Sequence, residues 1–339
     1  MKLASIKNDT RDGALAVVSR DLRHAVIVYE IAPTLQAALD DWAYIAPQLE
    51  SCYEALNRQP DSRSFSFDTA QCMAPLPRVH QRLVASAYLP HEELLRKARG
   101  DVMHENSRRD PLMAQGNSDQ MIGACDPIEA ASEEWDIDLG AEIAVILEDV
   151  PAGIKHDRTT ECIRLVVLAN EISLRSFMPT ELAKGLGYIN GRSATAFSPV
   201  AVTPDELGAA WDGKRVLRPL SVRVNDTLLG EPDCGSDMQF DFPHLIAHAA
   251  KTRRLGAGTV LGSGTISNSG HKNGYACIAE LRASNETEPA SYLRFGDRVR
   301  IDMLDAGGAS IFGAIDQIIV QHPVPKKSAE QAQPEDAEA

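Results

Sequence analysis

The chain has 339 residues, with 34 lysines and arginines against 48 aspartates and glutamates, so its formal net charge is −14. This acidic balance excludes non-specific nucleic-acid binding, which needs clustered basic side chains that displace counterions from phosphates. Hydrophobic residues make up 44% of the chain and charged residues 24%, which is typical of a globular protein with a sizeable core. The length predicts one large domain and a smaller one.

Cysteine usage and hydropathy further restrict the class of protein that this sequence can encode. The six cysteines are scattered without a CxxC pair, so no zinc or iron–sulfur signature is present. The opening MKLASIKNDT lacks the apolar stretch of a signal peptide, and no run of about 18 apolar residues predicts a membrane span. We therefore expect a protein of the reducing cytoplasm, with no membrane or nucleic-acid partner.

Residues 1–75 are predicted to form a small N-terminal α/β module. LAVVSR and HAVIVYE have the alternation of short strands, and apolar residues at helical spacing predict one helix over residues 35–56. The turn-rich NRQPDSRSFS and the prolines of MAPLPR end this module.

Residues 79–323 are predicted to form a large, strand-dominated domain. HEELLRKARG and FPHLIAHAAKT are its clearest helices, the second with Asp241 as N-cap and Pro243 in its first turn. Many strands between Gly- and Pro-rich turns predict an α+β fold with a mixed β roll or barrel, not a doubly wound sheet. The expected strands are VHQRLVASAYL, GAEIAVIL, CIRLVVLAN, SVRVNDTLL, TVLGSGTI, YACIAELRA, DRVRIDML and IDQIIVQH. The polar residues 324–339 are predicted to be disordered.

Three segments, in this order, resemble the fumarylacetoacetate hydrolase superfamily: SFMPTELAKGLGY…ATAFSPVAVTP, FDFPHLIAHAAKTRRLGAGTVLGSGTIS and FGDRVRIDM. The N-terminal module resembles the one carried by longer family members. The resemblance implies a rolled mixed β structure, a homodimer and a site at the strand ends. It also implies that Mg²⁺ or Ca²⁺ holds the oxygens of an oxo or diketo acid while a Glu–His dyad activates water.

The resemblance identifies two candidate catalytic residues. His91 opens HEELLRKAR and matches the family histidine, and Glu280 in YACIAEL matches the dyad glutamate of a late strand. A carboxylate bonded to one imidazole nitrogen raises the basicity of the other, as a general base requires. The alternative is that His91 only caps a helix and Glu280 is a solvated strand residue.

The implied metal ligands are largely replaced. Val84 stands where the family has an aspartate, and the Glu-x-Glu pair reads Gly140-Ala141-Glu142. Glu171 replaces the aspartate that should follow Asn170. Hard cations need several oxygen donors, so Glu142 and Glu171 predict a weakened or absent metal site. No cofactor is expected, with Mg²⁺ or Ca²⁺ as the alternative.

Two further aspartates precede this strand. Asp136 and Asp138 could share a face with Glu142, but two residues along a strand span about 6–7 Å, too far for the same ion. We interpret them as an exposed acidic strand start.

Three residues are candidate substrate binders. Arg175 matches the arginine of the family pattern N-D-x-S-x-R, Arg192 stands where the family has lysine, and Thr265 matches a threonine that binds substrate oxygens. Ala114 stands where relatives often carry tyrosine. Arg175 could instead pair with a carboxylate such as Glu171, and Thr265 could be a plain turn residue.

No phosphate-loop lysine follows GAGTVLGSG, and no G-x-S-x-G elbow occurs. The first hypothesis is therefore an enzyme that acts on an oxo or diketo acid through an enolate, by C–C hydrolysis, decarboxylation, isomerisation or cyclisation. In it an arginine replaces the ion. The alternatives are a catalytically silent binding or partner subunit, and an ordinary Mg²⁺-dependent hydrolase.

Overall fold

The described strands form two sheets, and the larger one contains most of them. The computed structural model describes residues 1–103, 105–119, 121–284 and 290–322. The main path of this 13-stranded sheet runs β4-β3-β2-β1-β13-β11-β10-β16-β5-β6, with β7, β9 and β12 attached beside β11. Its strands are β1 (Lys2–Ile6), β2 (Ala14–Val18), β3 (His24–Ile27), β4 (Phe65–Ser66), β5 (Arg82–Ala85), β6 (Met113–Gln115), β7 (Met121–Ile122), β9 (Ile137–Asp138), β10 (Ala141–Leu147), β11 (Ile163–Leu174), β12 (Arg192–Phe197), β13 (Ala201–Val202) and β16 (Val260–Gly262).

A smaller sheet of five strands has the order β15-β14-β17-β18-β8. Its strands are β8 (Ile128–Ala130), β14 (Ser221–Val224), β15 (Thr227–Gly230), β17 (Arg298–Asp302) and β18 (Ile315–Gln321). The segment SVRVNDTLL, expected as one strand, forms the hairpin β14–β15. Asn225 and Asp226 both have positive φ, 50° and 63°, as a two-residue hairpin turn requires, so they reverse the chain there.

The N-terminal strands continue the larger sheet, because β1 pairs antiparallel with β13. The expected single helix is wrong: α1 (Leu35–Asp40) and α2 (Trp42–Arg58) are separate. Asp41 between them has φ −135° and ψ 47°, which breaks the helical hydrogen-bond ladder. The buried faces of both helices pack with β1–β3 in a hydrophobic cluster that includes Leu35 and Leu49.

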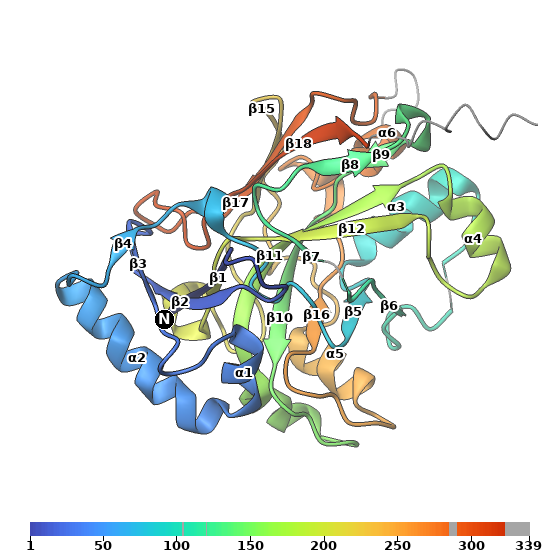
Figure 1. Ribbon diagram of the computed structural model, residues 1–339. Helices are drawn as coiled ribbons and strands as arrows, with labels where there is room; N and C mark the ends of the chain where they lie inside the picture. Colours follow the sequence, from blue (N-terminus) through green and yellow to red (C-terminus); the bar gives the residue numbers. More distant parts are fainter. Residues whose placement is uncertain (104, 120, 285–289, 323–339) are drawn as a thin grey trace, which may run out of the picture.

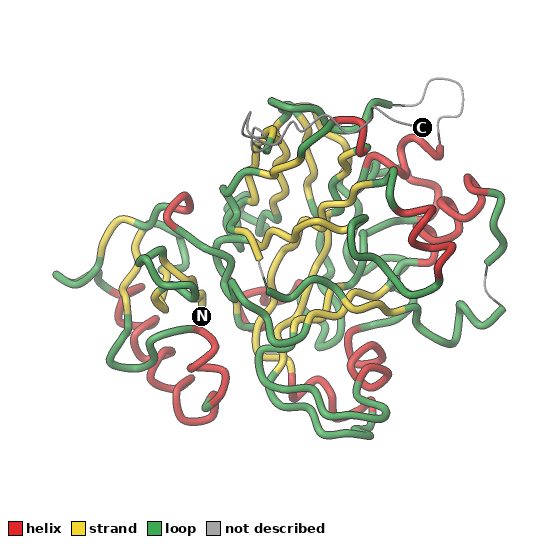
Figure 2. Tube along the Cα trace, turned by 45° about the vertical axis from the view of Figure 1, so that its right-hand side comes forward, coloured by secondary structure: helices red, strands yellow, loops and turns green. Residues whose placement is uncertain are grey.

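Among the described residues after β4, four further α-helices are present: α3 (Leu89–Arg99), α4 (Met178–Lys184), α5 (Phe242–Ala249) and α6 (Ile278–Ser284). Figure 1 places α3, α4 and α6 on the side of the strands opposite α1 and α2, and Figure 2 shows the same separation after rotation. The long antiparallel pair β10–β11 runs between them, and every residue of β10 is buried.

These observations confirm a strand-rich mixed fold. The described strands form open sheets and no closed barrel. The Asp241 prediction is also confirmed, since its side chain accepts a hydrogen bond from the backbone N–H of His244 at the start of α5. The expected strand YACIAELRA is wrong, because its second half is α6. In the part of the chain that the structure describes, no helix has the length and apolar content to cross a membrane.

Candidate active site

The predicted dyad residues lie on two helices that pack together, α3 and α6. His91 is in the first turn of α3, and its Nδ1 lies 2.9 Å from Glu280 Oε1. Glu280 is fully buried, whereas the His91 side chain is 14% exposed and lines a pocket. Glu280 is therefore a buried helix residue, not the strand residue that was expected. This contact leaves His91 Nε2 as the ring nitrogen available to a ligand.

Asp138 holds the start of α6, although sequence reasoning placed it on an exposed strand start. It is fully buried, and its carboxylate accepts hydrogen bonds from the backbone N–H groups of Ile278 and Ala279 at 2.8 and 3.1 Å. A carboxylate at this position satisfies N–H groups that have no partner within the helix. Asp138 thereby sets the position of the helix that carries Glu280.

The same aspartate pairs with Arg175. Arg175 Nε and Nη2 both lie 2.9 Å from Asp138 Oδ2, so its partner is Asp138 and not Glu171 as one alternative proposed. Burial alone would lower the pKa of Arg175, but the charge of Asp138 raises it above its usual value. Arg175 also lines the pocket, so one guanidinium both pairs with the α6 cap and faces the cavity.

The lining of the pocket includes two buried glutamates, one on each strand of the β10–β11 pair. Glu142 belongs to β10 and Glu171 to β11. Burial raises the pKa of Glu142, although the nearby guanidinium of Arg82 opposes this. Among the described residues Glu142 Oε2 has no hydrogen-bond partner.

Glu171 is neutralised by two arginines. Its Oε2 accepts from Arg82 Nη2 and, at 3.2 Å, from the Thr195 hydroxyl. Its Oε1 lies 3.6 Å from Arg192 Nε. Burial lowers the pKa of Arg82 to about 10, partly opposed by Glu142, so this guanidinium stays charged near neutral pH.

Arg82 is a site residue that sequence reasoning missed. It lies two positions before Val84 on β5, only 2% exposed, and Gly116 makes room for it: a Cβ there would lie 2.5 Å from Arg82 Nη1. A charged residue that begins a short apolar strand was the available signal. Its significance depends on Glu171, which is 89 residues away in the chain.

The donors at the family's metal position can be tested against a hard cation. Val84 and Gly140 provide no side-chain oxygen, and Val84 is paired with Ala114 on β6 and Gly262 on β16. A Cβ at Gly140 would lie 3.0 Å from the Glu171 carbonyl oxygen, so a larger residue is crowded there. Glu142 is the one carboxylate at this position without an ion pair among the described residues, and two guanidinium groups lie beside it. This donor set does not fit Mg²⁺ or Ca²⁺, which take several oxygens.

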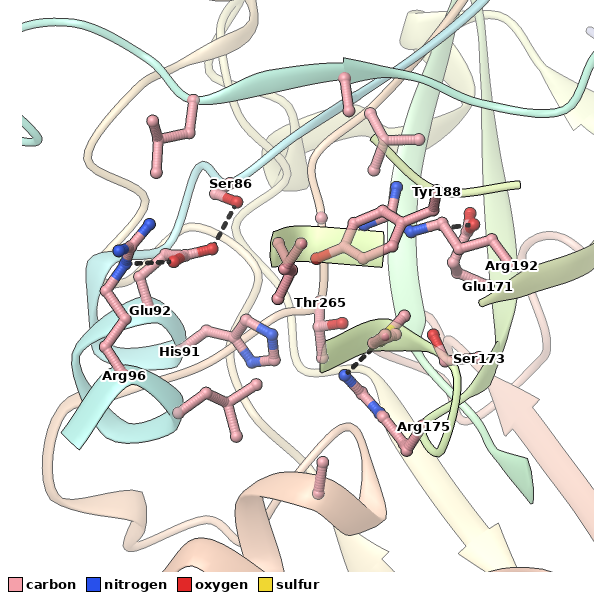
Figure 3. A pocket seen from close by; sticks show the side chains of 18 of the residues that line it. Ser86, His91, Glu92, Arg96, Glu171, Ser173, Arg175, Tyr188, Arg192 and Thr265 are labelled. Carbon is pink, nitrogen blue, oxygen red and sulfur yellow. Dashed lines mark hydrogen bonds and ion pairs between the residues drawn. The ribbon is translucent and has the colours of Figure 1, made fainter. Parts of the chain in front are cut away.

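The cavity has a volume of about 550 Å³. His91, Glu142, Glu171, Arg175, Arg192 and Thr265 all line it. Figure 3 shows the His91 ring pointing toward the middle of the pocket, with Thr265 nearby and Arg175 and Arg192 on the other side. The Arg192 guanidinium lies over the Tyr188 ring, 4.8 Å from its centroid, and its Nε and Nη1 have no hydrogen-bond partner among the described residues. A pocket of this size with convergent polar groups suits a small anionic ligand.

Two family models account for most of the chain. Residues 1–78 match the fumarylacetoacetase N-terminal domain 2, and residues 82–319 match the fumarylacetoacetate (FAA) hydrolase C-terminal domain. The chain belongs to the fumarylacetoacetate hydrolase family. Its two matched segments meet between residues 78 and 82, just before the strand that carries Arg82.

Solved structures with the same fold include a maleylpyruvate hydrolase from Sphingobium sp. SYK-6 in complex with manganese(II) and pyruvate, at 15% identity and a TM-score of 0.64. Others are a fumarylacetoacetate hydrolase from Exiguobacterium antarcticum, at 16% and 0.63, and a 5-carboxymethyl-2-hydroxymuconate delta-isomerase from Mycobacterium smegmatis, at 16% and 0.55. Each match covers 95% of this chain and 100% of the other. A search of curated proteins finds no match. At these identities the likeness shows the fold.

Proposed function

We propose that this family member is an enzyme that acts on an oxo or diketo acid through an enolate, with His91 as the base and without a bound metal ion. The observation that carries the proposal is the 2.9 Å contact between His91 and the buried Glu280 at the wall of a pocket lined by arginines. Relatives of the same fold are named as hydrolases and an isomerase of such acids.

The dyad supplies the base. When Glu280 accepts a hydrogen bond from Nδ1–H of His91, the imidazole is held in the tautomer that presents the Nε2 lone pair to the pocket. That nitrogen can remove a proton from a carbon next to a carbonyl group, or from an enol hydroxyl, and return it elsewhere. Asp138 acts as a positioning residue, because it anchors the helix that carries Glu280.

The arginines supply the positive charge. Arg82 and Arg192 flank Glu171 at the position where the family's carboxylates would surround a cation. Arg192 lines the pocket, and its Nη1 has no hydrogen-bond partner among the described residues, so we expect this nitrogen to donate to an enolate or carboxylate oxygen. Preorganised donors aimed at developing charge stabilise a transition state by several kcal/mol in general. Because guanidinium is a planar fork and not a point charge, we expect it to hold an enolate or carboxylate through two parallel hydrogen bonds.

This arrangement favours proton transfer over attack by an ion-activated water. Isomerisation of an oxo acid needs a base that forms the enolate and returns the proton. Decarboxylation releases CO₂ to leave the enolate, which then takes up a proton. Neither reaction needs a metal-bound hydroxide, so we place both ahead of C–C hydrolysis and cyclisation. Cytoplasmic location remains a prediction from the cysteine usage and hydropathy of the sequence. The homodimer remains a prediction from the family resemblance, and light scattering of the purified protein tests it.

The test uses full-length protein treated with EDTA. We expect enzyme-dependent exchange of the C3 protons of oxaloacetate or an acylpyruvate with deuterated solvent, followed by ¹H NMR. After subtraction of the rate without enzyme at the same metal concentration, added Mg²⁺ or Mn²⁺ should not increase this rate. His91→Gln should lower the rate by about 10²–10⁴-fold, and Glu280→Gln should lower kcat more than it raises KM. His80→Ala, at an exposed histidine outside the pocket, is the matched control.

Three results would overturn the proposal. Strict dependence on added Mg²⁺ would indicate the ordinary metal-dependent hydrolase. Ligand binding in a thermal melt without any exchange or turnover would indicate a silent binding protein. Activity unchanged in His91→Gln would remove the dyad from the mechanism.

A further inference from the structure

A second cluster of ligating side chains lies outside the pocket. His156 begins the 3₁₀ helix η3 (His156–Cys162), Asp241 is the N-cap of α5, and His244 is in the first turn of α5. None of the three lines the pocket. Figure 1 shows α5 at the lower end of the molecule, below α3, α4 and α6. The mechanism proposed above uses none of these side chains.

The three ligating atoms are spaced as they would be around one ion. His156 Nε2 lies 3.3 Å from Asp241 Oδ1, and His244 Nδ1 lies 2.9 Å from the same oxygen. The two rings have centroids 4.2 Å apart, and all three ligating atoms lie within 4.8 Å of one another. Ligands about 2.0–2.1 Å from a tetrahedral ion are separated from each other by about 3.3 Å.

The backbone around the cluster is fixed by contacts that do not involve the ligating rings. Asp241 accepts the backbone N–H of His244 at 3.0 Å, which sets the carboxylate against the first turn of α5. Thr159, fully buried, donates to the carbonyl of His156 at 2.8 Å and lies 3.3 Å from the carbonyl of Pro243. The two segments are therefore held side by side before any ligand arrives.

The donor types select a class of ion. Two imidazoles and a carboxylate suit Zn²⁺, Ni²⁺ or Co²⁺, whereas Mg²⁺ and Ca²⁺ prefer oxygen ligands alone. Asp241 is 7% exposed and His156 and His244 are 37% and 57% exposed, so an ion can enter from solvent and keep water ligands on its outer side.

We propose that His156, Asp241 and His244 form a binding site for a divalent transition-metal ion such as Zn²⁺, with water in the open position. The ion would cross-link η3, which joins β10 to β11, to the start of α5. The ion would thereby brace the connection between β10 and β11, the two strands that carry Glu142 and Glu171, without touching the pocket.

The experiment uses the EDTA-treated full-length protein, with Zn²⁺ binding measured by calorimetry and Co²⁺ binding by visible absorption. We expect one equivalent to bind, and His156→Ala and His244→Ala each to weaken binding by more than the roughly 10–100-fold lost when only an outer-shell partner is removed. The matched control is His248→Ala, one turn further along α5, where the ring faces Asp110 at 3.5 Å. That variant should bind Zn²⁺ as the wild type does.

Each other result overturns the proposal. Binding that is lost in His248→Ala would assign the ion to the i, i+4 pair of α5. Binding that survives both His156→Ala and His244→Ala would place it elsewhere, and no stoichiometric binding would leave Asp241 as a helix cap only. Circular dichroism of each variant distinguishes loss of a ligand from loss of the fold.

Discussion

Replacing Arg82 by methionine tests whether the guanidinium of Arg82 balances the buried charge of Glu171, the role that a metal ion would otherwise have. In the wild type, Glu171 is 3% exposed, and its Oε2 accepts a hydrogen bond from Arg82 Nη2. The substitution leaves the carboxylate with the Thr195 hydroxyl at 3.2 Å and Arg192 at 3.6 Å. Removing one partner of a buried pair costs about 3–5 kcal/mol of unfolding free energy, and we expect the lower end because Arg192 remains.

Urea unfolding of a double-mutant cycle measures the coupling. Arg82→Met and Glu171→Met should each destabilise the protein, whereas the double variant should be within about 1 kcal/mol of the wild type or more stable, because both buried charges are gone. Arg192 then loses its partner, but its side chain is 21% exposed and can reach water.

The pH dependence provides a second readout. Burial raises the pKa of Glu142, and the guanidinium of Arg82 opposes that rise. In Arg82→Met the folded-state pKa of Glu142 should therefore lie further above its unfolded value, so the stability of the variant should rise more steeply than that of the wild type as the pH falls toward about 5. Loss of less than about 1 kcal/mol in the single variant, or strictly additive effects in the cycle, would refute the reasoning.

Two further outcomes follow from the same geometry. Asp138→Ala leaves Arg175 without its partner and removes the carboxylate that accepts from two backbone N–H groups of α6, so urea unfolding should show a loss of about 3–5 kcal/mol. The exposed control Glu134→Ala should stay within about 0.5 kcal/mol of the wild type, and equal effects of the two substitutions would contradict the cap. Glu142 has a raised folded pKa, so its contribution to stability is complete below its unfolded pKa and is lost as the pH rises through the folded value. Glu142→Gln should therefore gain stability relative to the wild type as the pH rises above the unfolded value of about 4.5, and a difference that does not change with pH would contradict this.

Local sequence patterns were sufficient to predict the helices and strands that depend only on residues close to one another in the chain. The helix α5 begins where Asp241 and Pro243 predicted it, because an N-cap acts on N–H groups within three residues. The apolar strands β10 and β11 were also predictable from their composition. The helix α6 was not, because the short apolar segment YACIAEL fits either a strand or a helix. Its start depends on Asp138, 140 residues before Ile278 in the chain.

The amino-acid sequence alone determined which chemical groups are missing: valine at position 84 and glycine at position 140 offer no ligand oxygen in any fold. It also supplied His91 and Glu280 as a candidate pair. Only the tertiary structure decided which charges meet, so Arg82 neutralises Glu171 while Arg175 pairs with Asp138. Electrostatic attraction falls with distance through space and not along the chain, and these distances exist only after strands and helices far apart in sequence have packed together.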